Sequence, residues 1–207
     1  LAVAAQESTS DLLVIGSHTR SAVERWWRGS VSRGALHLAT TSVVLVPSAA
    51  ALEEARPLPV VREVLVATDL SDFGNKAVLH GASLLPEGGV LHLAHVLPLA
   101  LARTPVTSLA PMRPPTRDER AFARVREQLA RLVPREVLRR GIRVEVHALE
   151  GDVGDVLCRL ADQLAVDAVC MASRGRSGMA AMVLGSSTRR VLSAIDRPVY
   201  VVRDTGP

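Results

Sequence analysis

The sequence predicts an α/β protein whose main domain is a doubly wound, five-stranded parallel sheet, preceded by a half-domain of the same type. From residue 62 onward, short apolar runs alternate with segments of helical periodicity, which is typical of β-α-β units. The apolar runs are continuous, as in strands that are covered by helices on both faces of a sheet. In addition, residues 1–46 match residues 157–202 without a gap, which indicates an internal repeat.

The first 50 residues predict strand, helix and strand. The expected elements are a strand at Asp11–Gly16, a short helix at Val31–Ala39 and a strand at Ser42–Val46, which Pro47 stops. Two strands do not form a sheet that folds alone. We therefore expect this segment to dock on the rest of the chain, on another subunit or on further sequence upstream of Leu1, which already lies in a helical pattern.

Residues 51–61, with Pro57 and Pro59, predict a linker, and residues 62–203 predict one complete domain. Its expected strands lie at 62–68, 90–96, 142–149, 167–173 and 198–202. Its expected helices are four. The first lies at 73–85 and is capped by Ser71 or Asp72, and the second lies at 117–140 and is interrupted by Pro134. The third runs from a cap at Asp152 or Asp155 to residue 164, and the fourth lies at 188–194. Ligands of such a sheet bind at the carboxyl ends of the strands, near the point where the strand order reverses.

Composition argues against several classes of function. The net charge is +4, but the arginines are spread among acidic residues and aromatic residues make up only 2%, so we expect no nucleic-acid partner. Cys158 and Cys170 are expected to be reduced, packed thiols. The sequence has no apolar run of about 18 residues and no signal-peptide pattern at its start, so we expect no membrane association and a cytoplasmic location.

The stretch from Val169 to Ser187 predicts a phosphate-binding loop. An apolar strand leads into a loop of small residues, and Gly185, Ser186 and Ser187 then open a helix. Glycines let backbone N–H groups approach an anion, and the helix N-terminus adds about half a positive charge. The spacing Ala172-x2-Gly175-x9-Gly185-Ser186 recurs in the first repeat as Gly16-x2-Thr19-x9-Gly29-Ser30.

This spacing, together with Asp69-x-Ser71 after the first strand of the domain, resembles the universal stress protein family, in particular a tandem member with a truncated first repeat. The family signature is G-x2-G-x9-G-[ST], and each copy here lacks one of its glycines. The resemblance implies a Rossmann-like, adenine-nucleotide α-hydrolase-like fold that binds ATP or a related adenine nucleotide, with or without Mg²⁺. The implied nucleotide-binding residues are Asp69, Leu70, Ser71, Val96, Ala172, Arg174, Gly175, Gly185, Ser186 and Ser187.

Several interpretations stay open at this point. Asp69, Ser186 and Ser187 are also good helix caps, and Ala172 obstructs the ligand if its position requires a positive φ. The alternative function is a nucleotide-free dimerisation or regulatory module. The degenerate motif of the first repeat, at Gly16, Thr19, Gly29 and Ser30, is expected to form no site of its own.

Neither a catalytic residue nor a metal site is expected. The chain lacks G-x4-G-K-[ST], H-E-x-x-H and nucleophile-elbow motifs, so any ATP hydrolysis should be slow. His80, His92, His95 and His147 lie on a helix and on strands without the spacing of metal ligands. The family pairs through its last strand, here Pro198–Val202, so we expect a homodimer or pairing within the chain with Ser42–Val46.

Overall fold

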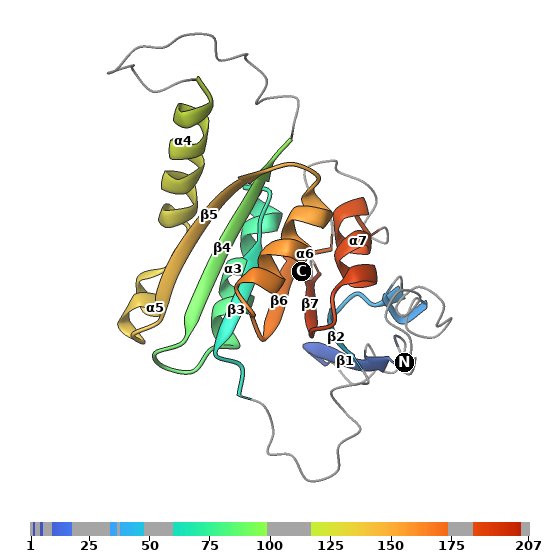
Figure 1. Cartoon of the computed structure of the whole chain (residues 1–207). Helices are drawn as coiled ribbons and strands as arrows, with labels where there is room; N and C mark the ends of the chain where they lie inside the picture. Colours follow the sequence, from blue (N-terminus) through green and yellow to red (C-terminus); the bar gives the residue numbers. More distant parts are fainter. Residues whose placement is uncertain are drawn as a thin grey trace, which may run out of the picture.

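In the computed structural model, which describes residues 2, 5, 10–17, 34–36, 38–47, 60–98, 117–173 and 184–203, seven strands form one sheet in the order β1-β2-β7-β6-β3-β4-β5 (Figure 1). The strands are β1 Leu12–Ser17, β2 Ser42–Pro47, β3 Glu63–Ala67, β4 Val90–Leu97, β5 Arg143–Glu150, β6 Ala168–Ala172 and β7 Val199–Val202.

The five strands that follow residue 62 are all parallel. β3 pairs with β4 on one side and with β6 on the other, and β5 and β7 extend the sheet outward from these neighbours. This arrangement confirms the predicted doubly wound sheet. The strand order reverses between β3 and β6, so a ligand site is expected at the carboxyl ends of these two strands.

Helices cover both faces of the sheet. They are α3 Asp72–Ser83, α4 Arg117–Arg131, α5 Arg135–Arg139, α6 Val153–Gln163 and α7 Ser186–Ala194. Because side chains alternate along a strand, Leu65 packs with the core beneath α6 and α7, whereas Val64 and Val66 pack with α3, α4 and α5. Figure 1 shows α6 and α7 side by side.

The ends of the helices follow the capping residues in the sequence. The Ser71 hydroxyl accepts a hydrogen bond from the Gly74 N–H at 3.0 Å and caps α3, and Asp152 caps α6 by accepting from the Asp155 N–H at 3.1 Å. Pro134 is the N-cap of α5, so the segment predicted at 117–140 is two helices. The last helix, predicted at 188–194 and opened by Gly185, Ser186 and Ser187, is α7; it begins at Ser186, and the extended Gly185 is its N-cap.

The first segment joins the sheet through an antiparallel pair. Val43 of β2 lies opposite Val201 of β7, and Leu45 lies opposite Val199. The predicted pairing within the chain is therefore present. β1 adds to the far side of β2 as a parallel strand. The buried Arg203, just after β7, reinforces this contact by donating to the Leu36 carbonyl and, through its backbone N–H, to the Ser42 hydroxyl at 3.1 Å.

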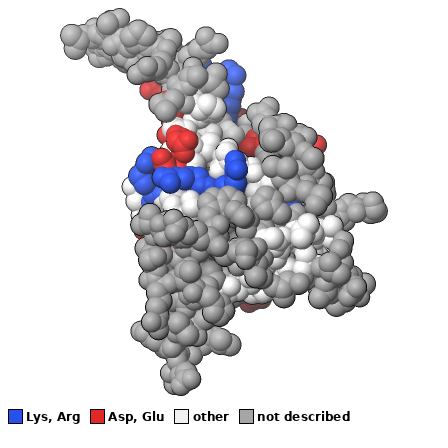
Figure 2. Space-filling view, turned by 90° about the vertical axis from the view of Figure 1, so that its right-hand side faces the viewer, with Lys and Arg blue, Asp and Glu red and all other residues white. Residues whose placement is uncertain are grey.

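No helix in the described ranges is both long and apolar enough to cross a membrane. On the face shown in Figure 2, a short band of basic side chains has acidic side chains directly beside it. Elsewhere among the described residues such neighbours form ion pairs, for example Arg190 with Asp155 at 2.7 Å and Arg197 with Asp162 at 2.6 Å. A basic stripe of the kind that follows a nucleic-acid backbone is not visible on the described part of that face.

The antiparallel pair predicts a large stability effect at Leu45. This side chain is fully buried on β2, so Leu45→Ala should lower the free energy of unfolding by about 2–5 kcal/mol. Val14→Ala on β1 is the control, because Val14 is 60% exposed and its truncation should cost less than about 0.5 kcal/mol. Urea denaturation followed by circular dichroism measures both; equal, small effects would mean that the first segment does not pack on the sheet.

Candidate functional site

A cavity of about 440 Å³ opens at the carboxyl ends of β3, β4 and β6, where the strand order reverses. Its volume falls within the roughly 300–1,000 Å³ of small-molecule sites. The lining residues come from the strand ends, from the start of α3, from α6 and from the start of α7: Ala67, Thr68, Asp69, Gly74, Ala94, His95, Val96, Leu97, Pro98, Val153, Leu157, Met171, Ala172, Gly185, Ser186, Ser187 and Thr188.

Asp69 is the acidic residue among these lining residues. Its Oδ1 accepts hydrogen bonds from the Ser71 hydroxyl at 2.6 Å and from the Ser71 N–H at 3.1 Å. Its Oδ2 is buried and has no hydrogen-bond partner among the described residues. A buried carboxylate oxygen without a donor is costly, so this atom is suited to accept a hydrogen bond from a ligand in the cavity.

The turn that carries Asp69 is held tightly against the start of α3. Leu70 has a φ of 64°, in the left-handed region, and its N–H donates to the Thr68 hydroxyl at 3.0 Å. A Cβ at Gly74 would lie 2.2 Å from the Asp69 Oδ1, so only glycine lets the helix approach the carboxylate this closely. The turn therefore fixes where Asp69 points.

Across the cavity, α7 begins without a side-chain cap. Gly185 is the N-cap, with φ −60° and ψ 154°, and it offers no side-chain oxygen to the N–H groups of the first turn. The Gly185 N–H itself donates to the Ser173 carbonyl at 2.9 Å. The start of α7, with the side chains of Ser186 and Ser187, lines the cavity, and the dipole of the helix favours an anion at this end.

Ala172 does not strain the backbone. It is the last residue of β6, it pairs with Val202, and its φ is not positive. A glycine is therefore not required there for its conformational freedom. The Thr188 hydroxyl of α7 donates to the Ala172 carbonyl at 3.1 Å, and this hydrogen bond ties the start of the helix to the end of the strand.

The remaining wall of the cavity is apolar. Val96 and Leu97 at the end of β4 line this wall together with Val153 and Leu157, which are one turn apart on α6. His95 lies beside them, and its Nδ1–H donates to the Thr68 carbonyl at 2.9 Å, which leaves Nε2 of a neutral ring as an acceptor. The cavity thus combines an apolar wall with polar groups from Asp69 and from the start of α7.

The structure brings together most of the predicted site residues that it describes. Asp69, Val96, Ala172, Gly185, Ser186 and Ser187 line the cavity. Leu70 and Ser71 do not line it; they shape the turn that holds Asp69. Arg174, Gly175, Thr19, Gly29 and Ser30 lie outside the described residues, and Gly16 lies on β1, away from the cavity.

Sequence reasoning missed Thr68, Gly74 and Thr188. Thr68 and Thr188 were visible as hydroxyl residues beside a predicted strand end and at a predicted helix start. Their partners, the Leu70 N–H and the Ala172 carbonyl, follow only from the three-dimensional structure. The close approach of Gly74 to the Asp69 carboxylate is likewise visible only in the structure.

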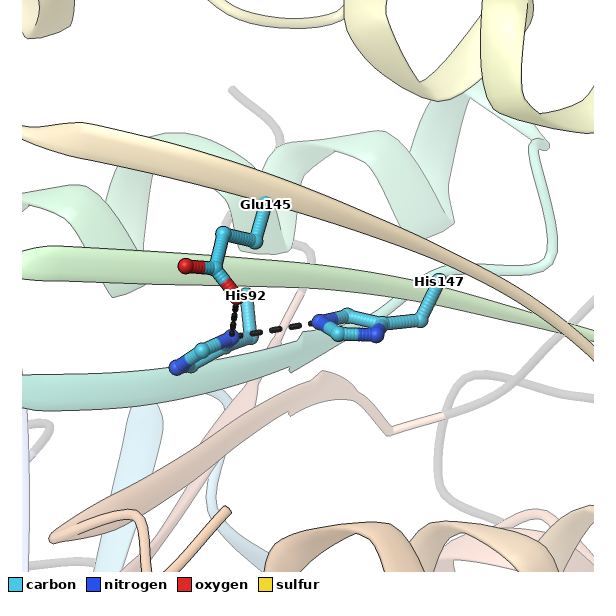
Figure 3. A group of neighbouring side chains, drawn as sticks. All are labelled: His92, Glu145 and His147. Atoms are coloured by element: carbon cyan, nitrogen blue, oxygen red, sulfur yellow. Dashed lines mark hydrogen bonds and ion pairs between the residues drawn. The ribbon is translucent and has the colours of Figure 1, made fainter.

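A second polar group lies toward the amino ends of the strands. His92 and His147, which carry no ligand spacing in the sequence, are neighbours in the structure, with Glu145 beside them (Figure 3). Burial lowers the pKa of His147, and the nearby His92 adds to this effect while Glu145 opposes it. We call His92, Glu145 and His147 the histidine cluster.

The model of the Universal stress protein family matches residues 1–47 and 61–203. The chain belongs to the universal stress protein family. Universal stress protein G of Shigella flexneri is 31% identical over 132 residues, which are 64% of this chain and 90% of that protein. The corresponding protein of Salmonella typhimurium LT2 is 29% identical over a stretch of the same length.

Solved structures of universal stress proteins share the fold. One from Archaeoglobus fulgidus has a TM-score of 0.63 at 22% identity, and the alignment covers 99% of this chain and 65% of that chain. Another, from Lactobacillus plantarum, has a TM-score of 0.54 at 18% identity, and the alignment covers 72% of this chain and all of the other. The membership agrees with the resemblance that the glycine spacing and Asp69-x-Ser71 indicated.

The hydrogen bond between α7 and β6 predicts a stability effect at Thr188. Thr188→Val keeps the shape of this 3% exposed side chain but removes the donor to the Ala172 carbonyl, so the free energy of unfolding should fall by about 1–3 kcal/mol. Ser193→Ala on the same helix removes an exposed hydroxyl that donates to Arg190 and should change little. Thermal denaturation compares the two; a Thr188 variant as stable as the Ser193 variant would contradict this role.

Proposed function

We propose that the cavity binds ATP or a related adenine nucleotide. The observation that carries this proposal is Asp69, which lines the cavity together with the start of α7 and whose buried Oδ2 has no donor among the described residues. A ribose hydroxyl would donate to Oδ2, as the family resemblance implies for this carboxylate. In this arrangement the base of the nucleotide would lie at the apolar wall and its phosphates at the start of α7.

The base would lie against the apolar wall, where Val96, Val153 and Leu157 supply surface and His95 supplies a ring acceptor. The phosphates would meet the first turn of α7, where backbone N–H groups and the Ser186 and Ser187 hydroxyls converge. We assign Arg174 and Gly175 to the same phosphate site from the sequence alone. Any Mg²⁺ would accompany the phosphates.

The cavity suits binding better than catalysis. Its described lining offers one carboxylate and one histidine, and both already make hydrogen bonds that position them. We therefore propose a stress-response regulatory module that at most hydrolyses ATP slowly. We further propose that residues 1–50 are half of a first repeat without a nucleotide site, that 51–61 are a linker, and that the protein is cytoplasmic.

The nucleotide-free alternative would use the edge of the last strand for dimerisation. In this chain β2 already pairs with that edge of β7, from Val43 opposite Val201 to Leu45 opposite Val199. A homodimer through β7 would have to displace β2. This favours the nucleotide-binding function for the cavity and makes pairing within the chain the proposed use of β7.

Asp69→Asn tests the ribose contact. The amide oxygen can still accept from Ser71, but the charged acceptor is lost, so the affinity for Mg-ATP should fall roughly 10- to 100-fold. Asp72→Asn is the matched control, because it removes an exposed carboxylate three residues away, in the first turn of α3. Isothermal titration calorimetry at fixed salt measures both. The absence of heat with the unmodified chain, or equal affinities of the two variants, would overturn the proposal.

Ala172→Gly tests whether the missing glycine of the signature matters. Because φ is not positive at Ala172, the glycine variant should bind Mg-ATP within about threefold of the unmodified chain. It should also lose about 0.5–1 kcal/mol of stability, since glycine weakens a strand. A tenfold or larger gain in affinity would show instead that the Ala172 methyl group obstructs the phosphates.

A further inference from the structure

The histidine cluster is built on two neighbouring parallel strands. His92 on β4 lies opposite Glu145 on β5, and His147 follows Glu145 by two residues, so all three side chains project from the same face of the sheet. Figure 3 shows His147 and Glu145 both directed toward the ring of His92. The cluster is separate from the nucleotide cavity, which begins at Ala94 on the same strand.

The distances within the cluster suit a metal ion. The Nδ1 of His92 lies 3.1 Å from the Nε2 of His147 and 3.5 Å from the Oε2 of Glu145, and the three ligand atoms lie within 4.8 Å of one another. Ligand atoms around a tetrahedral Zn²⁺, with bonds of about 2.1 Å, are about 3.4 Å apart. An ion between the three atoms would therefore require only small movements of the side chains.

Glu63 orients His92 for this role. Its Oε2 lies 3.2 Å from the Nε2 of His92, so Nε2 carries the proton and donates to the carboxylate. The Nδ1 of a neutral His92 then has its lone pair directed toward His147 and Glu145. A carboxylate that accepts from the outer ring nitrogen of a histidine is the usual support of a metal ligand.

Glu145 and the exposure of the cluster complete the arrangement. The Arg143 guanidinium lies 3.5 Å from the Oε1 of Glu145, which leaves Oε2 to the histidines. His92 is 3% exposed, whereas the Glu145 side chain is 43% exposed. An ion would thus have a rigid, buried ligand on one side and access from solvent on the other, with a fourth position open to water.

We propose that His92, His147 and Glu145 bind a divalent transition metal, with Zn²⁺ as the preferred ion, and that Glu63 is the residue that positions His92. Two imidazoles and one carboxylate favour Zn²⁺ and its neighbours over Mg²⁺ and Ca²⁺, which prefer oxygen ligands. On binding, the proton on the Nε2 of neutral His147 would move to its Nδ1 through solvent, so that the Nε2 of His147 and the Nδ1 of His92 both offer a lone pair to the metal. The metal and the nucleotide would occupy different sites on one face of the sheet.

The experiment is a zinc titration of the full chain, prepared without a histidine tag, in competition with a chromophoric chelator. One equivalent of Zn²⁺ should bind, and His147→Gln and Glu145→Gln should each weaken this binding at least about 100-fold. Glu63→Gln should weaken it 10- to 100-fold, because only the support of His92 is lost. His80→Gln is the control, since His80 contacts Tyr200 rather than the cluster and should leave the affinity unchanged.

Co²⁺ supplies a second measurement that does not depend on affinity alone. The unmodified chain should give the visible absorption bands of low-coordinate Co²⁺, and the His147 variant should lose them. Circular dichroism establishes whether each variant is folded. If the His147→Gln variant does not fold, the Glu145→Gln variant serves in its place, because the Glu145 side chain is half-exposed. Zinc binding that is absent in the unmodified chain, or equal in the control and in the cluster variants, would overturn the proposal.

Discussion

The pairing of β3 with β6 in the centre of the sheet is the constraint on which the rest of the structure depends. At the amino ends, the Asp167 carboxylate accepts from the N–H groups of Arg62 and Glu63 at 2.7 and 2.8 Å and fixes the register. At the carboxyl ends, the chain leaves β3 toward α3 on one face and leaves β6 toward α7 on the other. The cavity lies between the segment that leads from β3 to α3 and the start of α7.

The polar groups at the cavity show why this space keeps its shape. The Thr68 hydroxyl, the Gly74 backbone and Ser71 all hold the turn around Asp69, and Thr188 holds the start of α7. These hydrogen bonds satisfy the backbone at the points where regular structure ends. The Asp69 Oδ2, which has no partner among the described residues, and the start of α7, where Gly185 gives no side-chain cap, are the groups that we propose meet a ligand.

The sequence was sufficient for the parallel sheet and for most element boundaries, because both depend on local patterns: apolar runs and capping residues. It also predicted that Asp69 follows the first strand of the domain, where the structure has it lining the cavity. It also suggested the pairing of β2 with β7, since the sequence predicts each of them as the last strand of a repeat. It did not suggest the histidine cluster. His92 and His147 are 55 residues apart, and only the register of β4 against β5 makes them neighbours. Gly74 was missed because the sequence does not show that its backbone packs against the Asp69 carboxylate, which precedes the helix.

The antiparallel pair of β2 and β7 also determines when the sheet can form completely during synthesis. β2 is made before all the strands from β3 to β6, and the strand opposite it, β7 at Val199–Val202, is made after them. A ribosome adds about 5–20 residues per second, so β1 and β2 must wait through the synthesis of nearly all the intervening chain before their partner emerges. During that interval two apolar strands have no described neighbour but each other. Pairing of β2 with β7 is therefore a late, long-range event, and until it occurs β1 and β2 lack the protection that β7 gives them.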